Sequence, residues 1–171
     1  MGLKKHLIGL GLILGCFSAS SQIRNIKTAL PNVNVGDIFY IPFLDDPLFK
    51  VYNKSSLPQY YQVDGGYKGG RTQILTEFNR LIGKQIPADS DGFITIRFIV
   101  NKDGKTGRLR VFEIGSNYNQ HLFNFFLVER LLSFTKQLKC WKVAELKGVK
   151  TDYYQYLTFV IRDKKIVDIL P

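Results

Sequence analysis

The chain has 171 residues, which suits one domain with a hydrophobic core and is too short for two independent domains of ordinary size. Hydrophobic residues make up 45% and aromatic residues 13%, which excludes a chain that is disordered throughout. The formal charge of +10 favours acidic partners and carries no information about the fold.

The first segment has the layout of an export signal. A basic stretch at 1–6 precedes an apolar run at 7–14, and mostly small residues follow. The apolar run is far shorter than the roughly 20 residues that a membrane-spanning helix needs. A buried N-terminal helix would show the same apolar run, but Lys4, Lys5 and the small residues argue against it. We therefore predict that residues 1–21 are a signal peptide and that the protein is exported.

Two cleavage positions compete at the end of this signal. Ile13-Leu14-Gly15-Cys16 resembles a bacterial lipobox, in which Cys16 becomes the lipidated first residue and attaches the protein to a membrane. Ala19-Ser20-Ser21 instead resembles a small-x-small site. In either case Cys140 is the only other cysteine, which excludes an internal disulfide between unmodified thiols. Its place beside Trp141 predicts a small buried hydrophobic residue.

Residues 22–66 are the least regular part of the chain. Four prolines interrupt this stretch, and its apolar residues come in short runs. The pattern predicts an extended N-terminal arm with one or two short strands. Asp45 and Asp46 fall in its turns, where we expect solvated carboxylates.

A first helix is predicted after two glycine pairs. Thr72 is the expected N-cap, the helix runs to about Ile82, and Gly83 is the expected stop. The glycines before it lack the Gly-Lys-Ser/Thr ending of a phosphate-binding loop, so they predict a turn.

Two strands follow, at 93–100 and 108–114. In the first, alternate positions are all apolar, which is typical of a half-buried strand. Asp103-Gly104 between the strands predicts a tight turn with positive backbone angles. The apolar positions of the first strand are Ile94, Ile96, Phe98 and Val100.

The remaining elements complete an α+β domain at 67–171. A second helix is predicted at 119–138, with Asn117 or Asn119 as its cap, and a third strand at 153–162. The stretch 166–170 is either a short return strand or a tail. The order helix, strand, strand, helix, strand predicts two helices packed on one face of a small antiparallel sheet.

Several motifs follow one another in a characteristic order: Gly69-Gly70, Pro87, the hairpin Ile96–Gly104, Trp141 with Ala144, and Gly148. Through them the stretch 67–161 resembles the C-terminal domain of TonB-type energy transducers. The resemblance implies a two-helix, three-stranded fold in the periplasm that contacts outer-membrane transporters, with a transporter segment added beside the last strand. The membrane anchor and the Pro-rich spacer of that family are missing, so we expect a stand-alone exported form.

The third strand carries the candidate binding residues. If it is an open edge, a partner strand pairs with its backbone and the outward side chains flank the added peptide. The alternative is that its tyrosines pack on the helices or form cross-strand pairs. A few main-chain hydrogen bonds would give micromolar or weaker binding. The candidates are Tyr153, Tyr154, Tyr156, Thr158 and Val160.

The sequence suggests no catalytic, metal or cofactor site. His121 is the only histidine after the signal and has no second ligand at metal spacing. Asp89 and Asp91 lack the full ligand set of a calcium loop and are expected in turns.

We therefore predict a non-enzymatic interaction module of the periplasm or outer membrane. Its expected partner is an envelope protein, with TonB-dependent transporters as the candidates implied by the resemblance. The alternative is a structural envelope protein that binds anionic polymer or a membrane surface through its basic charge. Arg97, Arg108 and Arg110 stand among aromatic residues and could bind a polyanion, but an exported protein is not expected to meet nucleic acid.

Overall fold

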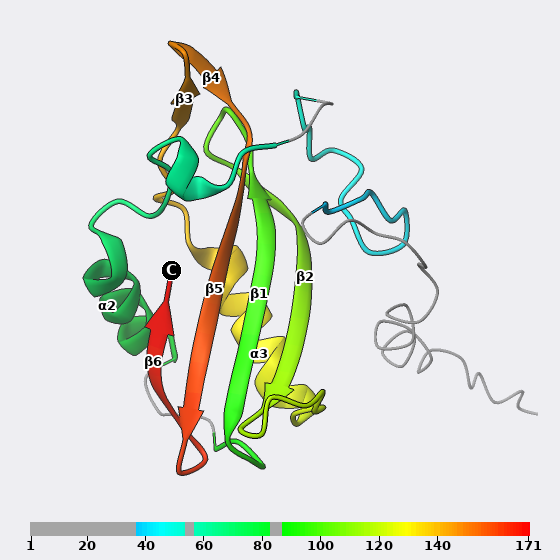
Figure 1. The fold of residues 1–171 in the computed structure, drawn as a ribbon, viewed down its shortest axis with the longest axis vertical. Helices are drawn as coiled ribbons and strands as arrows, with labels where there is room; N and C mark the ends of the chain where they lie inside the picture. The colour runs from blue at the N-terminus through cyan, green and yellow to red at the C-terminus, as the bar shows by residue number, and fades with distance from the viewer. Residues whose placement is uncertain (1–36, 54–56, 83–86) are drawn as a thin grey trace, which may run out of the picture. The chain divides into compact units, whose positions relative to one another are not determined.

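The computed structural model describes residues 37–53, 57–82 and 87–171 (Figure 1). The predicted signal peptide, Cys16 and the helix stop at Gly83 lie outside these residues. No helix in the described ranges combines the length and the apolar character needed to cross a membrane.

A four-stranded antiparallel sheet organises the domain, and the predicted α+β class is confirmed. The strands stand side by side in the order β2-β1-β5-β6, with helices α2 and α3 beside them (Figure 1). The bounds are β1 Gly92–Val100, β2 Thr106–Gly115, β5 Tyr153–Arg162, β6 Lys165–Leu170, α2 Gly70–Ile82 and α3 Phe125–Gln137.

One face of this sheet forms the core with both helices. The predicted apolar positions of β1 are all fully buried, because every second side chain of a strand points to the same face. Phe78 of α2, Phe134 of α3 and Phe159 of β5 meet there, with ring centroids 5.2 to 6.3 Å apart. Ile166 and Ile169 of β6 join the same cluster, so 166–170 is a strand that belongs to the core.

Both helices begin elsewhere than predicted. Helix α2 starts at Gly70, and Thr72 lies within it, where its carbonyl accepts a hydrogen bond from the Thr76 hydroxyl. Helix α3 starts only at Phe125, capped by the Asn124 side chain, which accepts from the Phe126 N–H at 2.8 Å. The helix cannot start at Asn119, because residues 119–121 return along β2 and bond its backbone.

The β1–β2 hairpin has the predicted strands and a different turn. Only Gly104 of the predicted pair has a positive φ, at 75°. Asn101 closes the turn, since its backbone bonds Gly104 and Lys105 and its side chain accepts from two further N–H groups.

A second, smaller hairpin was not predicted. Strands β3 (Ala144–Leu146) and β4 (Val149–Thr151) pair only with each other and project at the top of Figure 1. Gly148, expected at the end of a loop, lies in the turn of this hairpin.

Two further expectations are wrong. Cys140 is exposed, because the chain turns outward between the buried Leu138 and Trp141. The described part of the N-terminal arm contains a short 3-10 helix, η2 (Tyr60–Gln62), and a single bridge at Gln59, with no strand.

Candidate functional site: the open face of the sheet

Strand β5 is an interior strand, so the predicted open edge is wrong. It pairs with β1 from Tyr153 to Ile161, which is all but its last residue. On its other side β6 covers it from Thr158 to Arg162. Nearer its start, the Tyr154 N–H donates to the carbonyl of Pro58 at 2.9 Å. A partner strand therefore has no continuous free edge on β5.

Two of the five predicted binding residues are structural. The Tyr153 side chain is fully buried on the helix side, where its hydroxyl donates to the Lys142 carbonyl at 2.9 Å and accepts from the Gly66 N–H at 3.2 Å. Burial raises the pKa of Tyr153 to about 12. Tyr154 is buried on the opposite side, and burial is also the main cause that raises the pKa of its hydroxyl.

The other three candidates lie half-buried on the face opposite the helices, which we call the open face. Tyr156 packs edge-on against Tyr60 with ring centroids 5.5 Å apart. The Thr158 hydroxyl bonds the Thr95 hydroxyl across the strands at 2.9 Å. Val160 stands opposite Phe93 in the β1–β5 register. Only part of the predicted set therefore remains accessible, and it belongs to a face rather than an edge.

The N-terminal arm covers one end of this open face. Ile38 and Leu57 of the arm form a second buried cluster with Ile99 of β1 and Tyr154 of β5. Phe49 packs against the same cluster and lies so close to Gly107 that a Cβ there would come within 2.4 Å of its ring. The described part of the arm thus packs on the sheet as part of the domain.

Two arginines fasten the arm, which corrects the expectation that they are free for a polyanion. Arg110 makes a two-pronged ion pair with Asp45, with N–O distances of 2.7 and 2.8 Å, and also donates to the Phe39 carbonyl. Arg108 donates to the Ile38 carbonyl. Asp45, predicted to be solvated, is instead buried, because its charge partner Arg110 stands on the sheet beneath the arm.

A buried carboxylate binds the arm at a second place, residues 52 and 53. Asp152 is fully buried just before β5, and its two oxygens accept from three backbone N–H groups. The donors are Tyr52 and Asn53 of the arm, at 2.5 and 2.8 Å, and Lys102 of the β1–β2 turn, at 2.7 Å. Such bonds satisfy a buried charge that would otherwise be costly.

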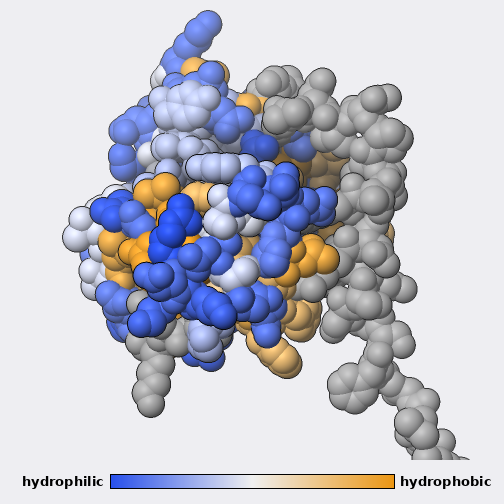
Figure 2. Space-filling model, turned by 60° about the horizontal axis from the view of Figure 1, so that its bottom comes forward, coloured by the Kyte–Doolittle hydropathy of each residue, from blue (hydrophilic) through white to orange (hydrophobic). Residues whose placement is uncertain are grey.

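The rest of the open face carries an exposed apolar patch, which we define as Phe93, Phe112, Ile114, Tyr118 and Val160. Phe112, Ile114 and Tyr118 are 43%, 37% and 78% exposed. Tyr118 stacks on Phe93, with ring centroids 6.1 Å apart, and the Arg162 guanidinium lies 4.9 Å from the Phe93 ring. Figure 2 views the lower end of the domain in Figure 1 and shows hydrophobic surface exposed there between hydrophilic regions.

The free main-chain groups of this surface are on β2, an outer strand of the sheet. The Gly115 N–H and the Glu113 carbonyl point away from β1, since they bond residues 119 and 121. Groups two residues apart point the same way in a strand, so the N–H and C=O of Val111 also point outward. Within the described ranges no other backbone group bonds them.

The structure also brings together Ser90 and His121, a pair that the sequence did not suggest. The Ser90 Oγ lies 2.5 Å from the His121 Nε2 at the lower end of the sheet. Among the described residues no carboxylate bonds the other ring nitrogen, as a catalytic triad would require. The loop that carries His121 is placed by its pairing with β2, which the sequence pattern did not reveal.

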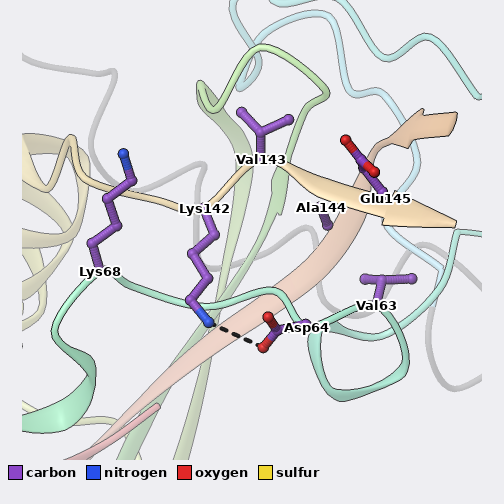
Figure 3. A pocket seen from close by; sticks show the side chains of 7 residues that line it. All are labelled: Val63, Asp64, Lys68, Lys142, Val143, Ala144 and Glu145. Carbon is purple, nitrogen blue, oxygen red and sulfur yellow. Dashed lines mark hydrogen bonds and ion pairs between the residues drawn. The ribbon is translucent and has the colours of Figure 1, made fainter. Parts of the chain in front are cut away.

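One open groove lies at the base of the β3–β4 hairpin. It has a volume of about 520 Å³ and is lined by Val63, Asp64 and Lys68 from one segment and Lys142, Val143, Ala144 and Glu145 from another. Figure 3 shows the Lys142 ammonium directed at the Asp64 carboxylate, 3.0 Å away. Its two lysines and two acids balance, so the groove does not select a charged ligand.

Across the described residues, no three His, Cys, Asp or Glu side chains are grouped to hold a metal ion. Comparison of the chain with protein-family models, curated proteins and solved structures found no match. The candidate site therefore rests on the geometry of the open face and of β2.

Proposed function

We propose that this protein is a non-enzymatic interaction module of the cell envelope that binds an extended segment of another envelope protein. The segment lies along the outer edge of β2 and over the exposed apolar patch. A TonB-dependent transporter remains the candidate partner that the family resemblance implies.

The exposed apolar patch is the observation that carries this proposal. An antiparallel sheet with helices on one face ordinarily presents polar side chains on the other. Here Phe112 and Ile114 are exposed on an outer strand, beside Phe93 and Val160. Exposed apolar surface of this kind is typical of interaction sites.

The arm indicates what kind of ligand suits the face. It is an irregular chain whose apolar side chains pack on the sheet and whose carbonyls accept from arginines. A partner segment on the remaining part of the face can use the same two kinds of contact. The outward groups of Val111 add main-chain bonds worth about 1 kcal/mol each, so we expect transient, micromolar binding.

Photo-crosslinking in intact cells tests the site. A photoreactive residue in place of Phe112 is expected to form an adduct with one envelope protein, and a photoreactive residue in place of Val167 on β6 serves as the control. Val167 is also exposed, at 56%, and lies on the other outer strand. Equal adducts from both positions would contradict the proposed surface.

Two variants separate side-chain contact from strand pairing. Phe112→Thr with Ile114→Thr keeps strand propensity and removes apolar area, so capture of the crosslinked partner is expected to fall at least tenfold. Val111→Pro removes an outward N–H and keeps the bonds to β1, so it should weaken capture only if the partner pairs with β2. Val167→Thr is the matched control, and unchanged capture by the Phe112 and Ile114 variant would refute the proposal.

The non-enzymatic part has its own test at Ser90. A fluorophosphonate probe labels serines that a neighbouring base has activated. We expect no labelling of the folded protein, because no carboxylate among the described residues orients the His121 ring. Labelling that disappears in Ser90→Ala would make the protein a hydrolase candidate and overturn this part of the proposal.

A further inference from the structure

The tip of the β3–β4 hairpin carries apolar side chains that do not pack in the hydrophobic core. Leu146 and Val149 pair across the strands, with 44% and 68% of their surface exposed. Lys147 and Gly148 between them have positive φ values of 53° and 78°, which is the geometry of a type I′ turn. Buried Ala144 and Thr151 fix the base of the hairpin, so the tip is free to contact something else.

Positive charge gathers around this hairpin. Lys147 and Lys150 are exposed, and no described residue forms an ion pair with either of them. Lys150 stands opposite Glu145 in the strand register. The β1–β2 turn contacts residues 141–143 through Gly104. This turn adds two positive charges, Lys102 and Lys105, and one negative charge, Asp103.

The opposite end of the sheet differs in charge. Around its loops, Asp89, Asp91 and Asp163 stand against Arg162, Lys164 and Lys165, so the charges there balance. The groove at the base of the hairpin is balanced, with Lys68 and Lys142 facing two acids (Figure 3). The unbalanced lysines therefore lie at the tip and on the neighbouring turn.

We propose that the hairpin tip docks on an anionic lipid surface. Leu146 and Val149 enter the headgroup region, and Lys147 and Lys150 face the lipid phosphates. Two aliphatic side chains are too small for a stable protein interface, which buries roughly 800 Å² on each partner. They suit interfacial binding, in which a small apolar area and nearby basic charge act together. This proposal is independent of the partner site on β2.

Vesicle co-sedimentation tests it with the chain that lacks the signal peptide and any acyl group. Binding is expected to phosphatidylcholine vesicles that contain a quarter phosphatidylglycerol and not to phosphatidylcholine alone. It should weaken steeply with added salt, because the attraction is partly electrostatic. Equal binding to both kinds of vesicle would overturn the proposal.

Paired variants locate the contact without weakening the hairpin. Lys147→Asn with Lys150→Gln creates the Asn-Gly pair that a type I′ turn favours, and should lower the partition coefficient roughly 30-fold. Leu146→Thr with Val149→Thr keeps strand propensity and should lower it several-fold. The matched control is Lys164→Asn, Lys165→Gln and Val167→Thr at the β5–β6 turn, where Lys164 also has a positive φ of 58°. If this control lost as much binding as the tip variants, the assignment to the tip would be wrong.

Val149→Trp adds a reporter at the tip, while Trp141 stays buried as a constant background. Its emission should shift to the blue on anionic vesicles and be quenched by brominated acyl chains. Sedimentation without such a shift would show that another surface binds lipid.

If the tip variants lost capture of an envelope protein and kept vesicle binding, the tip would be a protein contact instead. The Phe112→Thr and Ile114→Thr variant should sediment normally, which keeps the two proposals separable.

Discussion

The Tyr153 hydroxyl bonds two segments that an isolated antiparallel bridge, between Tyr67 and Trp141, also holds together. It bonds the Gly66 N–H and the Lys142 carbonyl, and its ring lies so close to Gly65 that a Cβ there would come within 2.6 Å. Burial raises its pKa to about 12, against 10.0 in an unfolded chain. The folded protein therefore holds this proton more tightly than the unfolded chain does. The resulting stability is present below pH 10 and is lost as the pH rises towards 12.

This difference predicts an alkaline loss of stability. Between pH 10 and 12 the Tyr153 proton should contribute a fall of about 1.4 kcal/mol per pH unit in the free energy of unfolding. Tyr153→Phe is less stable at neutral pH, because two buried backbone groups lose a partner, but its stability should fall less steeply above pH 10. Urea titrations at several pH values measure both slopes. If stability fell equally steeply with pH in the wild type and in Tyr153→Phe, the alkaline loss would not come from the Tyr153 proton.

Single residues were the hardest features to predict. Asp45 falls among turn residues and was expected in solvent, yet it pairs with Arg110, 65 positions later. Nothing local in either segment encodes that contact, because it depends on where the arm crosses the sheet. Cys140 was expected to be buried beside Trp141, but the backbone direction between helix and strand decides its exposure.

At the scale of elements, the arm is held by the Asp45–Arg110 ion pair, by the Asp152 carboxylate and by the cluster around Ile38 and Leu57. Removing one partner of a largely buried ion pair leaves the other charge unpaired, and this costs about 3 kcal/mol. Asp45→Ala should therefore loosen the arm and leave the helices and the sheet folded.

Limited proteolysis measures this loosening. Trypsin is expected to cut after Lys50 several times faster in Asp45→Ala than in the wild type, because the arm detaches more often. Asp46→Ala is the matched control, since Asp46 is exposed and its side chain accepts from the nearby Leu48 N–H. Equal cleavage in both variants would mean that the Asp45–Arg110 ion pair does not hold the arm in place.

Strands with strong alternation were predicted well, and short or irregular elements were not. The period-two pattern located β1, β2 and β5 within two residues of their observed ends. The β3–β4 hairpin has only three residues in each strand, too few for a pattern to be recognised. The second helix was predicted to begin at residue 119, because apolar residues are frequent from 122 onward. Residues 119–124 instead form the loop beside β2 and the helix cap.

For the whole molecule, the order of strands decided which predictions about the site failed. The sequence predicted a strand at 153–162 and left its neighbours open, since residues 166–170 fitted both a strand and a tail. Once β6 pairs with β5, the outer strands are β2 and β6. The accessible apolar side chains are then found on a face that no local pattern marks as exposed. The identity of the partner depends on contacts with another molecule, so neither the hydrophobic pattern of the sequence nor the order of the strands encodes it.

The Asp152 carboxylate also has a mechanical consequence. A pull on the chain before Asp37 meets the arm contacts in series, first at Arg108 and Arg110 and then at the backbone bonds of Tyr52 and Asn53 to Asp152. Asp152 immediately precedes β5, which is hydrogen-bonded on both sides. Tension would therefore reach the outer strand β2 through Arg108 and Arg110 and the interior strand β5 through Asp152, while the hairpin tip bears no load.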